Sequence, residues 1–470
     1  MSLIEEKVSD LKTGLKSRHI TMMSIAGVIG GTLFVGSGSV IHSAGPAAIL
    51  AYILGGLILL LIMRMLGEMA VATPDTGSFS TYADKSIGRW AGFTIGWMYW
   101  LFWGTVMAWE AFVAGNILNV FFPAISSNWF VLIVTLALLV VNFFNVKNYG
   151  EFEFWFALIK VIAIVSFIAL GFLVVFNIYN IEAPHGISNF TAQGFMPNGI
   201  APVFGAVLGV MFAFVGAEIA TIAASETENP AREIKKTNKT IVWRICIFYI
   251  GSIFFLICIV PWNDPLLGQS GYGAYRRALE IIGIPGAQTL MNIVVLTSLS
   301  SCLISAHYAG SRMLYSLALR GDAPAILKKT TQKTGVPIAA VLATSIIAVT
   351  FSLINLNPAF SSKDMLITLM NLTGAIGLLI YLVIACSQLK MRKQLEAKGV
   401  ELEIKMWLYP WLTWAVIVFI ILFLIGMLFI EEYRLLVGST AMTMAGIAMV
   451  GIIKQIKSKV AKPPVITEFS

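Results

Sequence analysis

The stretch SIAGVIGGTLF, from Ser24 to Phe34, contains the three glycines Gly27, Gly30 and Gly31 in an otherwise apolar segment. Each glycine inside a helix costs about 1 kcal/mol relative to alanine, so their clustering needs a reason. One interpretation is close packing of two helices through the small residues Gly27 and Gly31. The other is a break in the helix, which is tolerated at membrane depth only where the freed backbone is buried in protein or lines a polar cavity.

The composition of the whole chain predicts a membrane protein. Of its 470 residues, 58% are hydrophobic and 12% are charged, whereas soluble domains have about 25% charged residues. Apolar segments of the length that crosses a bilayer recur along the chain. We therefore predict an all-α integral membrane protein with about twelve spans, near residues 19–41, 47–71, 92–119, 128–145, 153–176, 201–224, 240–260, 285–318, 336–356, 364–386, 408–430 and 434–453.

The basic residues predict the orientation. With both termini inside, most of the 32 Lys and Arg residues fall in cytoplasmic segments; the exceptions are Arg276, Arg277, Lys363 and Arg434 outside, and Arg64, Lys160 and Arg312 in or at the edge of spans. This asymmetry predicts a multi-pass protein of the cell membrane with cytoplasmic termini. It also assigns the net charge of +8 to membrane topology rather than to nucleic-acid binding.

The predicted organisation has five parts: a cytoplasmic tail (1–18), a transport core (19–386), a cytoplasmic loop (387–407), two peripheral spans (408–453) and a cytoplasmic tail (454–470). The first eighteen residues are polar and lack the apolar core of a signal peptide. Between spans two and three, a Pro–Asp–Thr–Gly turn precedes a short amphipathic stretch, which predicts an interfacial helix.

Several function classes are excluded or disfavoured by missing motifs. The chain has no phosphate-binding G-x-x-x-x-G-K-[ST] loop, which makes an ATP-driven pump a poor fit, and no H-E-x-x-H or hydrolase constellation. Its four cysteines lie in apolar spans without C-x-x-C spacing, which is typical of packing residues. We predict no cofactor and no metal, and secondary transport is the leading class, ahead of an intramembrane enzyme or a channel.

A second glycine-containing span supports the break. The stretch GVMFAFVGAEIATIAASETENP, in the sixth predicted span, has Gly209, Gly216 and then the acidic residue Glu218. Inverted-repeat transporters carry discontinuous helices at corresponding positions of their two halves, and the amides of such a half-helix attract a substrate carboxylate. Spans one and six are therefore predicted to form a substrate site.

Longer motifs make the chain recognisable. It resembles the amino-acid/polyamine/organocation permeases, and within them the bacterial amino-acid permeases that include the 4-aminobutyrate (GABA) permeases. The resemblance covers residues 15–455 and is carried by LKSRHITMMSIAGVIGGTLFVGSG, IMRMLGEMAVATPDTGSFSTYADKSIGRWAGFTIGW, VKNYGEFEFW, GFMPNG, VGAEIATIAASETENP, SRMLYSLALRGDAP, YLVIACSQLKMRK and KMWLYPWLTW. It implies a LeuT-like fold, with spans 1–5 and 6–10 as inverted repeats, discontinuous helices 1 and 6, and proton-coupled uptake of an amino acid by alternating access.

The resemblance also implies the substrate contacts. The substrate carboxylate is expected at the backbone of Ala26, Gly27, Gly30, Gly31 and Thr32, and the ammonium at carbonyls near Phe212, Ala213 and Val215. Phe212 resembles the aromatic gate that covers the substrate; the alternative is an ordinary apolar side chain. Thr32 has the alternative of a hydroxyl bonded only to its own backbone.

Lys160 is the most informative charge because it lies inside the apolar fifth span. A lysine at mid-span costs several kcal/mol unless it is paired or neutral, which makes it a functional candidate. In relatives, a lysine here occupies the space where sodium-dependent cousins hold a sodium ion, against span-one backbone and span-eight polar residues such as Ser301 and Ser305. Lys160 is thus predicted to couple protons or to act as a fixed cation; the alternative is a lysine that snorkels to the cytoplasmic interface.

Four further features have open assignments. Glu110, in span three, is predicted to hold the substrate ammonium or a proton, or to be a buried hydrogen-bonded acid. Glu218 is predicted to gate the site or cap the broken helix, with a proton relay as the alternative. Arg64 and Glu68, spaced i, i+4, are predicted to form a local ion pair at an inner gate. In span eight, Ile304 is assigned to the pocket, and His307 is expected to be a hydrogen-bonded structural histidine, with a histidine that titrates near neutral pH as the alternative.

The predicted partners are a small amino acid, protons and the lipid bilayer. The predicted function is proton-coupled import of a small zwitterionic amino acid, either GABA or an analogue such as β-alanine, proline or alanine. GABA has its amine three methylenes from its carboxylate, so Glu110 is the expected acceptor for that amine. The alternatives are a proton-independent exchanger and an amino-acid sensor that does not transport. The sequence leaves the oligomeric state open.

Overall fold

The computed structural model describes residues 15–26, 29–143, 146–178, 186–192, 194–269, 272–356 and 365–460. Within these ranges the chain forms helices and no strand. The helices are α1 (Ser17–Ala26), η1 (Thr32–Gly36), α2 (Ser37–Ala44), η2 (Gly45–Ala47), α3 (Ala48–Ala72), α4 (Ser78–Ser86), α5 (Arg89–Phe121), α6 (Ser127–Val141), α7 (Val146–Val175), η3 (Gly186–Phe190), α8 (Ala201–Phe214), α9 (Ile219–Ala224), α10 (Pro230–Arg244), η4 (Ile245–Gly251), α11 (Ser252–Ile259), α12 (Ala274–Ile282), α13 (Ala287–Leu319), η5 (Ala325–Lys328), α14 (Ile338–Asn355), α15 (Met365–Ala397), α16 (Trp411–Leu428) and α17 (Glu431–Val460).

Ten helical segments of the described residues are long and apolar enough to cross a membrane. One of them, Thr32–Ala72, has 41 residues and holds the end of the first predicted span together with the second. Helix α6, at the fourth predicted span, is shorter, with 15 residues. The all-helical membrane architecture is thus as predicted, with the first span divided and the fourth short.

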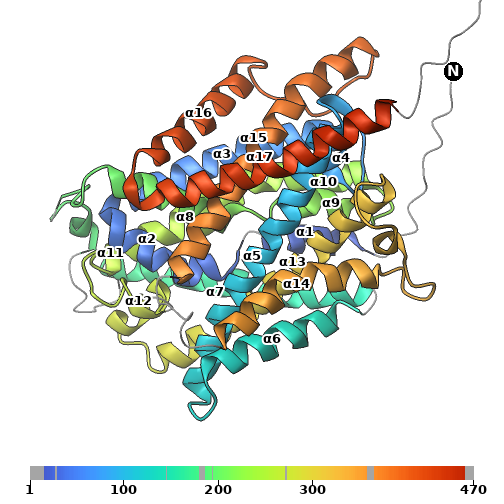
Figure 1. The fold of residues 1–470 in the computed structure, drawn as a ribbon. Helices are drawn as coiled ribbons and strands as arrows, with labels where there is room; N and C mark the ends of the chain where they lie inside the picture. The colour runs from blue at the N-terminus through green and yellow to red at the C-terminus, as the bar shows by residue number, and fades with distance from the viewer. Residues whose placement is uncertain are drawn as a thin grey trace, which may run out of the picture.

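Two spans are interrupted in mid-course. The first is divided into α1 and the pair η1–α2, and the sixth into α8 and α9. In Figure 1, α1 and α9 lie toward one end of the bundle, whereas α2 and α8 lie toward the other. Helices α5 and α13, each of 33 residues, pack against one another between these halves. At 1.5 Å per residue each is about 50 Å long, enough to pass the whole site and extend beyond the hydrocarbon layer.

Some helices extend beyond the predicted spans. Helix α15 continues to Ala397, into the predicted loop 387–407, and α17 continues to Val460, into the predicted tail. The sequence SQLKMRKQLEA that follows residue 386 is rich in good helix formers. Hydropathy marks where a chain leaves the hydrocarbon layer, and a helix of polar residues can continue past that point.

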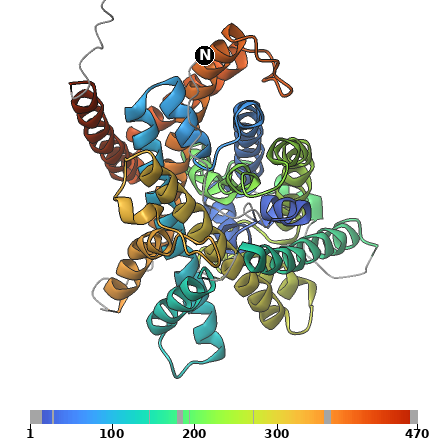
Figure 2. The same ribbon diagram turned by 90° about the vertical axis from the view of Figure 1, so that its right-hand side faces the viewer.

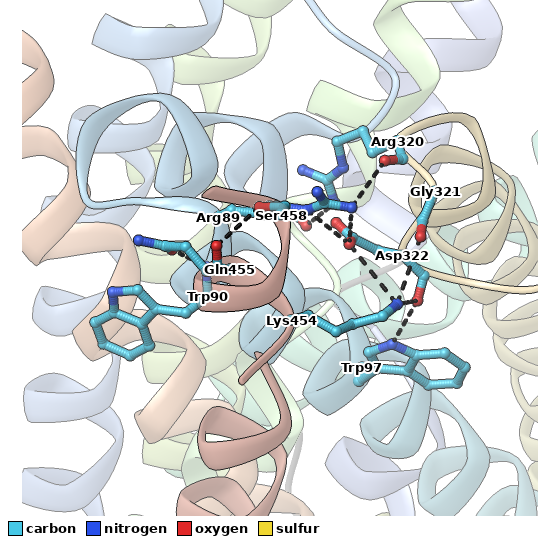
Figure 3. A network of polar contacts seen from close by, with 10 residues as sticks. Arg89, Trp90, Trp97, Arg320, Gly321, Asp322, Lys454, Gln455 and Ser458 are labelled. Carbon is cyan, nitrogen blue, oxygen red and sulfur yellow. Dashed lines mark hydrogen bonds and ion pairs between the residues drawn. The ribbon is translucent and has the colours of Figure 1, made fainter. Parts of the chain in front are cut away.

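Helix α17 lies on the outside of the bundle, as the end-on view of Figure 2 shows, and only 17% of its most apolar window is buried. Its final turns are nevertheless fixed by polar contacts (Figure 3). Gln455 accepts a hydrogen bond from the Trp90 amide at 3.0 Å, and Lys454 contacts the Asp322 carbonyl oxygen at 3.5 Å. Asp322 in turn accepts two hydrogen bonds from Arg89, at 3.0 and 3.1 Å. These contacts join α17 to the start of α5 and to the loop after α13.

Candidate functional site

The first span is interrupted at its glycines. Helix α1 ends at Ala26, residues 29 and 30 are not helical, and the π-helical turn η1 begins at Thr32. The carbonyl oxygen of Ile29 accepts hydrogen bonds from Lys160 Nζ at 2.9 Å and from Ser298 Oγ at 3.2 Å. Two side chains therefore satisfy a carbonyl group that the interruption frees from the helix. Gly27 lies outside the described residues, as does the side chain of Ala26.

Gly30 and Gly31 are needed for close approach of a carboxylate. A Cβ atom at Gly30 would lie 3.0 Å from Glu110 Oε1, and one at Gly31 would lie 2.9 Å from Glu110 Oε2 and 2.3 Å from Leu299. Gly30 and Gly31 thus lie beside the break and also let side chains of α5 and α13 approach it, whereas the packing interpretation depends on Gly27, which lies outside the described residues. The Glu110 carboxylate lies against the glycines that we predict to receive the substrate carboxylate.

The sixth span is interrupted at Val215 and Gly216. Val215 is extended after the end of α8, and Gly216 has φ +116°, a conformation that favours glycine. The Glu218 carboxylate accepts hydrogen bonds from the Gly216 amide at 3.0 Å and from the Tyr99 hydroxyl at 3.1 Å. Glu218 therefore fixes the turn and connects it to α5.

A small cavity lies where the two interruptions meet. Its lining comes from the first break, α5, the sixth span and α13, namely Gly30, Thr32, Phe102, Trp103, Val106, Glu110, Phe212, Ala213, Val215 and Cys302. Six of the ten predicted substrate contacts belong to this set. The volume of about 10 Å³ is close to the minimum that holds one water molecule. The cavity is thus too small for an amino acid, and it must widen before a substrate can bind.

Two predicted contacts from the sixth span have partners already. The Phe212 ring packs edge-on against Trp109, with centroids 5.2 Å apart and an interplanar angle of 89°. The Ala213 carbonyl accepts a hydrogen bond from the Tyr249 hydroxyl at 2.9 Å. A carbonyl oxygen has two lone pairs, so Ala213 retains the capacity to accept a second bond.

Lys160 is fully buried beside the first break. Its ammonium donates to the Ile29 carbonyl and to Ser301 Oγ, each at 2.9 Å, which confirms the predicted contact with span-one backbone and span eight. Complete burial excludes a lysine that snorkels to the interface. Ser301 donates onward to Glu153 Oε1 at 2.8 Å, so a buried carboxylate lies one hydroxyl group away from the ammonium.

The two span-eight residues are buried in α13. Ile304 is packed in the core but does not line the cavity, where Cys302 takes its place. His307 Nδ1 is 2.8 Å from the Leu303 carbonyl oxygen, which is the hydrogen-bonded structural arrangement expected for it.

The predicted ion pair between Arg64 and Glu68 is wrong. Arg64 donates to the Lys405 carbonyl at 2.9 Å and lies over the Trp407 ring at 4.3 Å. Glu68 accepts hydrogen bonds from Gln388 at 2.8 Å and from Arg392 at 3.3 Å. The partners come from α15 and the loop after it, because an i, i+4 spacing identifies neighbours on one helix but not competing groups from another.

Sequence reasoning also missed four residues. Trp103 lines the cavity, Glu153 accepts a bond from Ser301, and Arg312 forms a buried ion pair with Glu226 at 2.8 Å. Glu153 had a usable signal, since it lies seven residues before Lys160 and thus on the same helix face. Glu226 had no such signal, because its partner Arg312 is distant in the sequence.

Known proteins resemble this chain over nearly its whole length. A model of the amino acid permease family matches residues 19–457. A probable GABA permease of Pseudomonas aeruginosa is 53% identical over 94% of this chain and 92% of its own length. The γ-aminobutyric acid permeases of Escherichia coli and Bacillus subtilis are 52% and 46% identical, over 93% and 98% of this chain and 93% and 97% of their own lengths.

A solved structure supports the fold. The outward-open, substrate-bound form of a Na⁺-coupled sialic acid symporter superposes with a TM-score of 0.57 at 14% identity, covering 87% of this chain and 89% of that one. At this identity the match concerns the fold alone. The family model spans the interrupted helices and the cavity between them, and the chain belongs to the amino acid permease family.

Proposed function

We propose that this permease imports a small zwitterionic amino acid, with GABA the first candidate, together with protons. The observation that carries the proposal is one small cavity that joins two interrupted helices and is lined by Glu110, with the Lys160 ammonium bound to the Ile29 carbonyl immediately before the lining residue Gly30. Relatives described as GABA permeases, about half identical over nearly the whole chain, support the substrate class.

Each end of the substrate has a complementary group. We assign the carboxylate to backbone amides of Gly30, Gly31 and Thr32, helped by the positive end of the resuming helix. The ammonium would then face the carbonyl groups around Ala213. In GABA, the three methylenes between carboxylate and amine let the ammonium reach the Glu110 carboxylate. The Glu110 side chain must then move away from Gly30 and Gly31, because the substrate carboxylate takes its place there.

Transport would follow an alternating-access cycle of a LeuT-like fold. We propose that spans 1–5 and 6–10 are inverted repeats and that both termini are cytoplasmic, in agreement with the distribution of basic residues. Phe212 would move to admit substrate, with Glu218 fixing the turn beside it. Arg64 and Glu68, through their contacts with α15 and the loop 398–410, would belong to the inner gate.

Lys160 is the proposed coupling residue. Its ammonium binds the carbonyl oxygen of the first break, so a change in its charge alters the stability of that break. A buried ammonium without its partners costs several kcal/mol, which links protonation to the conformation of span one.

The test is uptake of labelled GABA into proteoliposomes with an inside-alkaline pH gradient and no sodium. We expect concentrative uptake that a protonophore abolishes, and competition by unlabelled β-alanine, proline and alanine ranks the substrates. Uptake that requires preloaded amino acid would identify an exchanger instead. Binding without flux would identify a sensor.

A further inference from the structure

A stripe of polar side chains runs along one face of α13. Ser301, Ser305, Tyr308 and Arg312 are all buried and are spaced by four, three and four residues, which places them on one side of the helix. Buried polar groups inside a membrane bundle are expensive and mark functional paths. The proposed substrate contacts account for none of these four residues.

The stripe faces three polar residues of α7, namely Tyr149, Glu153 and Lys160. Lys160 Nζ donates to Ser301 Oγ at 2.9 Å, and Ser301 Oγ donates to Glu153 Oε1 at 2.8 Å. Both bonds point the same way, from the ammonium through the hydroxyl to the carboxylate. This is the arrangement that a proton transfer through a hydroxyl group requires.

We propose that Glu153 receives the coupled proton from Lys160 through Ser301. The inference rests on the proposed proton-coupled function. In this step an N–H bond of Lys160 breaks and its proton binds Ser301 Oγ, while the original hydroxyl proton of Ser301 moves to Glu153 Oε1. Ser301 is regenerated, and the ammonium–carboxylate pair becomes a neutral amine and a neutral acid.

The low-dielectric surroundings favour such an exchange. Lys160, Ser301 and Glu153 are each 0% exposed, and Glu153 Oε2 has no hydrogen-bond partner among the described residues. Isolated charges are costly in this environment, so the charged and neutral forms of the pair lie closer in energy than in water. A single hydroxyl group between them keeps the transfer distance short.

The stripe continues from Glu153 toward the end of the bundle that we predict to be cytoplasmic. Tyr149 contacts Ser305 at 3.3 Å and stacks on Tyr308 with ring centroids 4.6 Å apart. Arg312 lies 4.3 Å above the Tyr308 ring and pairs with Glu226 at 2.8 Å. The proton would leave on this side when the buried Arg312–Glu226 pair opens.

Other ionisable groups of the described elements that pack against α7 have separate contacts. His19 of α1 contacts Glu151 at 3.1 Å, and Tyr249 of η4 donates to the Ala213 carbonyl. Glu110 and Cys302 line the cavity and interact with the Lys160 ammonium electrostatically, with no hydrogen bond to Ser301 among the described residues. Glu153 is therefore the carboxylate that Ser301 connects to Lys160.

The experiment compares Ser301→Ala with Ser300→Ala in proteoliposomes. Ser300 is its neighbour on α13 and donates to the Leu296 carbonyl at 2.8 Å, so this control removes a hydroxyl from the same helix without touching the proposed path. Ser301→Thr retains the hydroxyl group at this position. Glu153→Gln removes the carboxylate that would bind the proton. Two assays are needed: GABA accumulation driven by an inside-alkaline gradient, and GABA exchange at equal pH on both sides.

We expect Ser301→Ala and Glu153→Gln to reduce the initial rate of gradient-driven GABA accumulation by about 100-fold, the scale of general acid–base effects on a rate, while exchange stays near wild type. Ser301→Thr keeps the hydroxyl group and should accumulate GABA at close to the wild-type rate. Ser300→Ala should also leave that rate unchanged. If Ser301→Ala and Glu153→Gln show the same gradient-driven accumulation as the wild type, the proposed proton path is wrong but the proposed proton-coupled function holds. An equal loss of exchange would indicate a structural role and overturn the path. A wild type insensitive to the gradient would overturn both proposals.

Discussion

Gly31 is a residue at which one added methyl group has a predictable effect. Its Cβ position is 2.3 Å from Leu299 and 2.9 Å from Glu110, whereas the nearest atoms to that of Gly30 are the end of the flexible Glu110 side chain at 3.0 Å and Cys302 Sγ at 3.6 Å. Overpacking of this kind typically costs about 1–3 kcal/mol. We therefore expect Gly31→Ala to lower the apparent unfolding temperature and uptake, and Gly30→Ala to have a smaller effect.

Thermal unfolding of the purified variants, together with GABA uptake, checks this prediction. Gly446→Ala is the control, because nothing lies within 4 Å of that Cβ position. Its expected effect is neutral or slightly stabilising, since alanine favours a helix. Equal effects at Gly30 and Gly31 would contradict the packing argument.

Single residues differ in how far the sequence alone identifies them. Lys160 could be predicted because a charge inside an apolar span is costly whatever surrounds it. Its partner Ser301 could be predicted through the family resemblance. The partners of Glu68 could not be, because Gln388 and Arg392 reach it from α15, more than 300 positions away. Ile304 was assigned to the cavity, but the direction of each side chain on α13 leaves that position to Cys302.

At the scale of elements, the interruption of the sixth span depends on Gly216. Its φ of +116° is strained for any residue with a side chain, at a cost of about 1–3 kcal/mol. We expect Gly216→Ala to raise the KM for uptake as well as to lower stability, because Phe212, Ala213 and Val215 line the cavity immediately before it.

Gly283→Ala is the matched control for this prediction. Gly283 has φ +82° at the end of α12, with open space around its Cβ position and no contact with the cavity. It should lower stability by strain alone and leave the KM unchanged. If both variants changed the KM equally, the effect of Gly216→Ala would come from general strain and not from the cavity residues beside it.

Element boundaries were the part of the fold least accessible to sequence reasoning. The three clustered glycines indicated the interruption of the first span, and a glycine followed by an acidic residue indicated that of the sixth, since a helix interior rarely contains such groups. Hydropathy could not show that α15 continues to Ala397 or that η1 and η4 are π-helical. These features depend on local hydrogen bonding and on polar helix formers, neither of which a hydropathy profile measures.

At the scale of the whole molecule, the polar contacts in Figure 3 hold α17 against the end of α5 and the loop after α13. Asp322 is almost fully buried and accepts both bonds from Arg89, while Lys454 reaches mainly backbone oxygens. We expect Asp322→Asn to lower stability by about 1–1.5 kcal/mol, because asparagine keeps the Oδ1 acceptor for Arg89 but loses the charge that makes these bonds about twice as strong. Gln455→Ala should cost about 1 kcal/mol, because a single neutral bond to the Trp90 amide is lost.

Thermal unfolding in detergent and in liposomes measures these losses, with Lys457→Gln as the control because Lys457 is exposed on the same helix. Because α5 carries Glu110 and Trp103 to the cavity and Arg89 begins that helix, release of α17 should also reduce the uptake rate. The reduction should be smaller than for Gly31→Ala, since Gly31 lies at the first break against Glu110, whereas Figure 2 shows α17 on the outside of the bundle. If Asp322→Asn matched Lys457→Gln in both measurements, α17 would be an appendage whose contacts do not contribute to the position of α5.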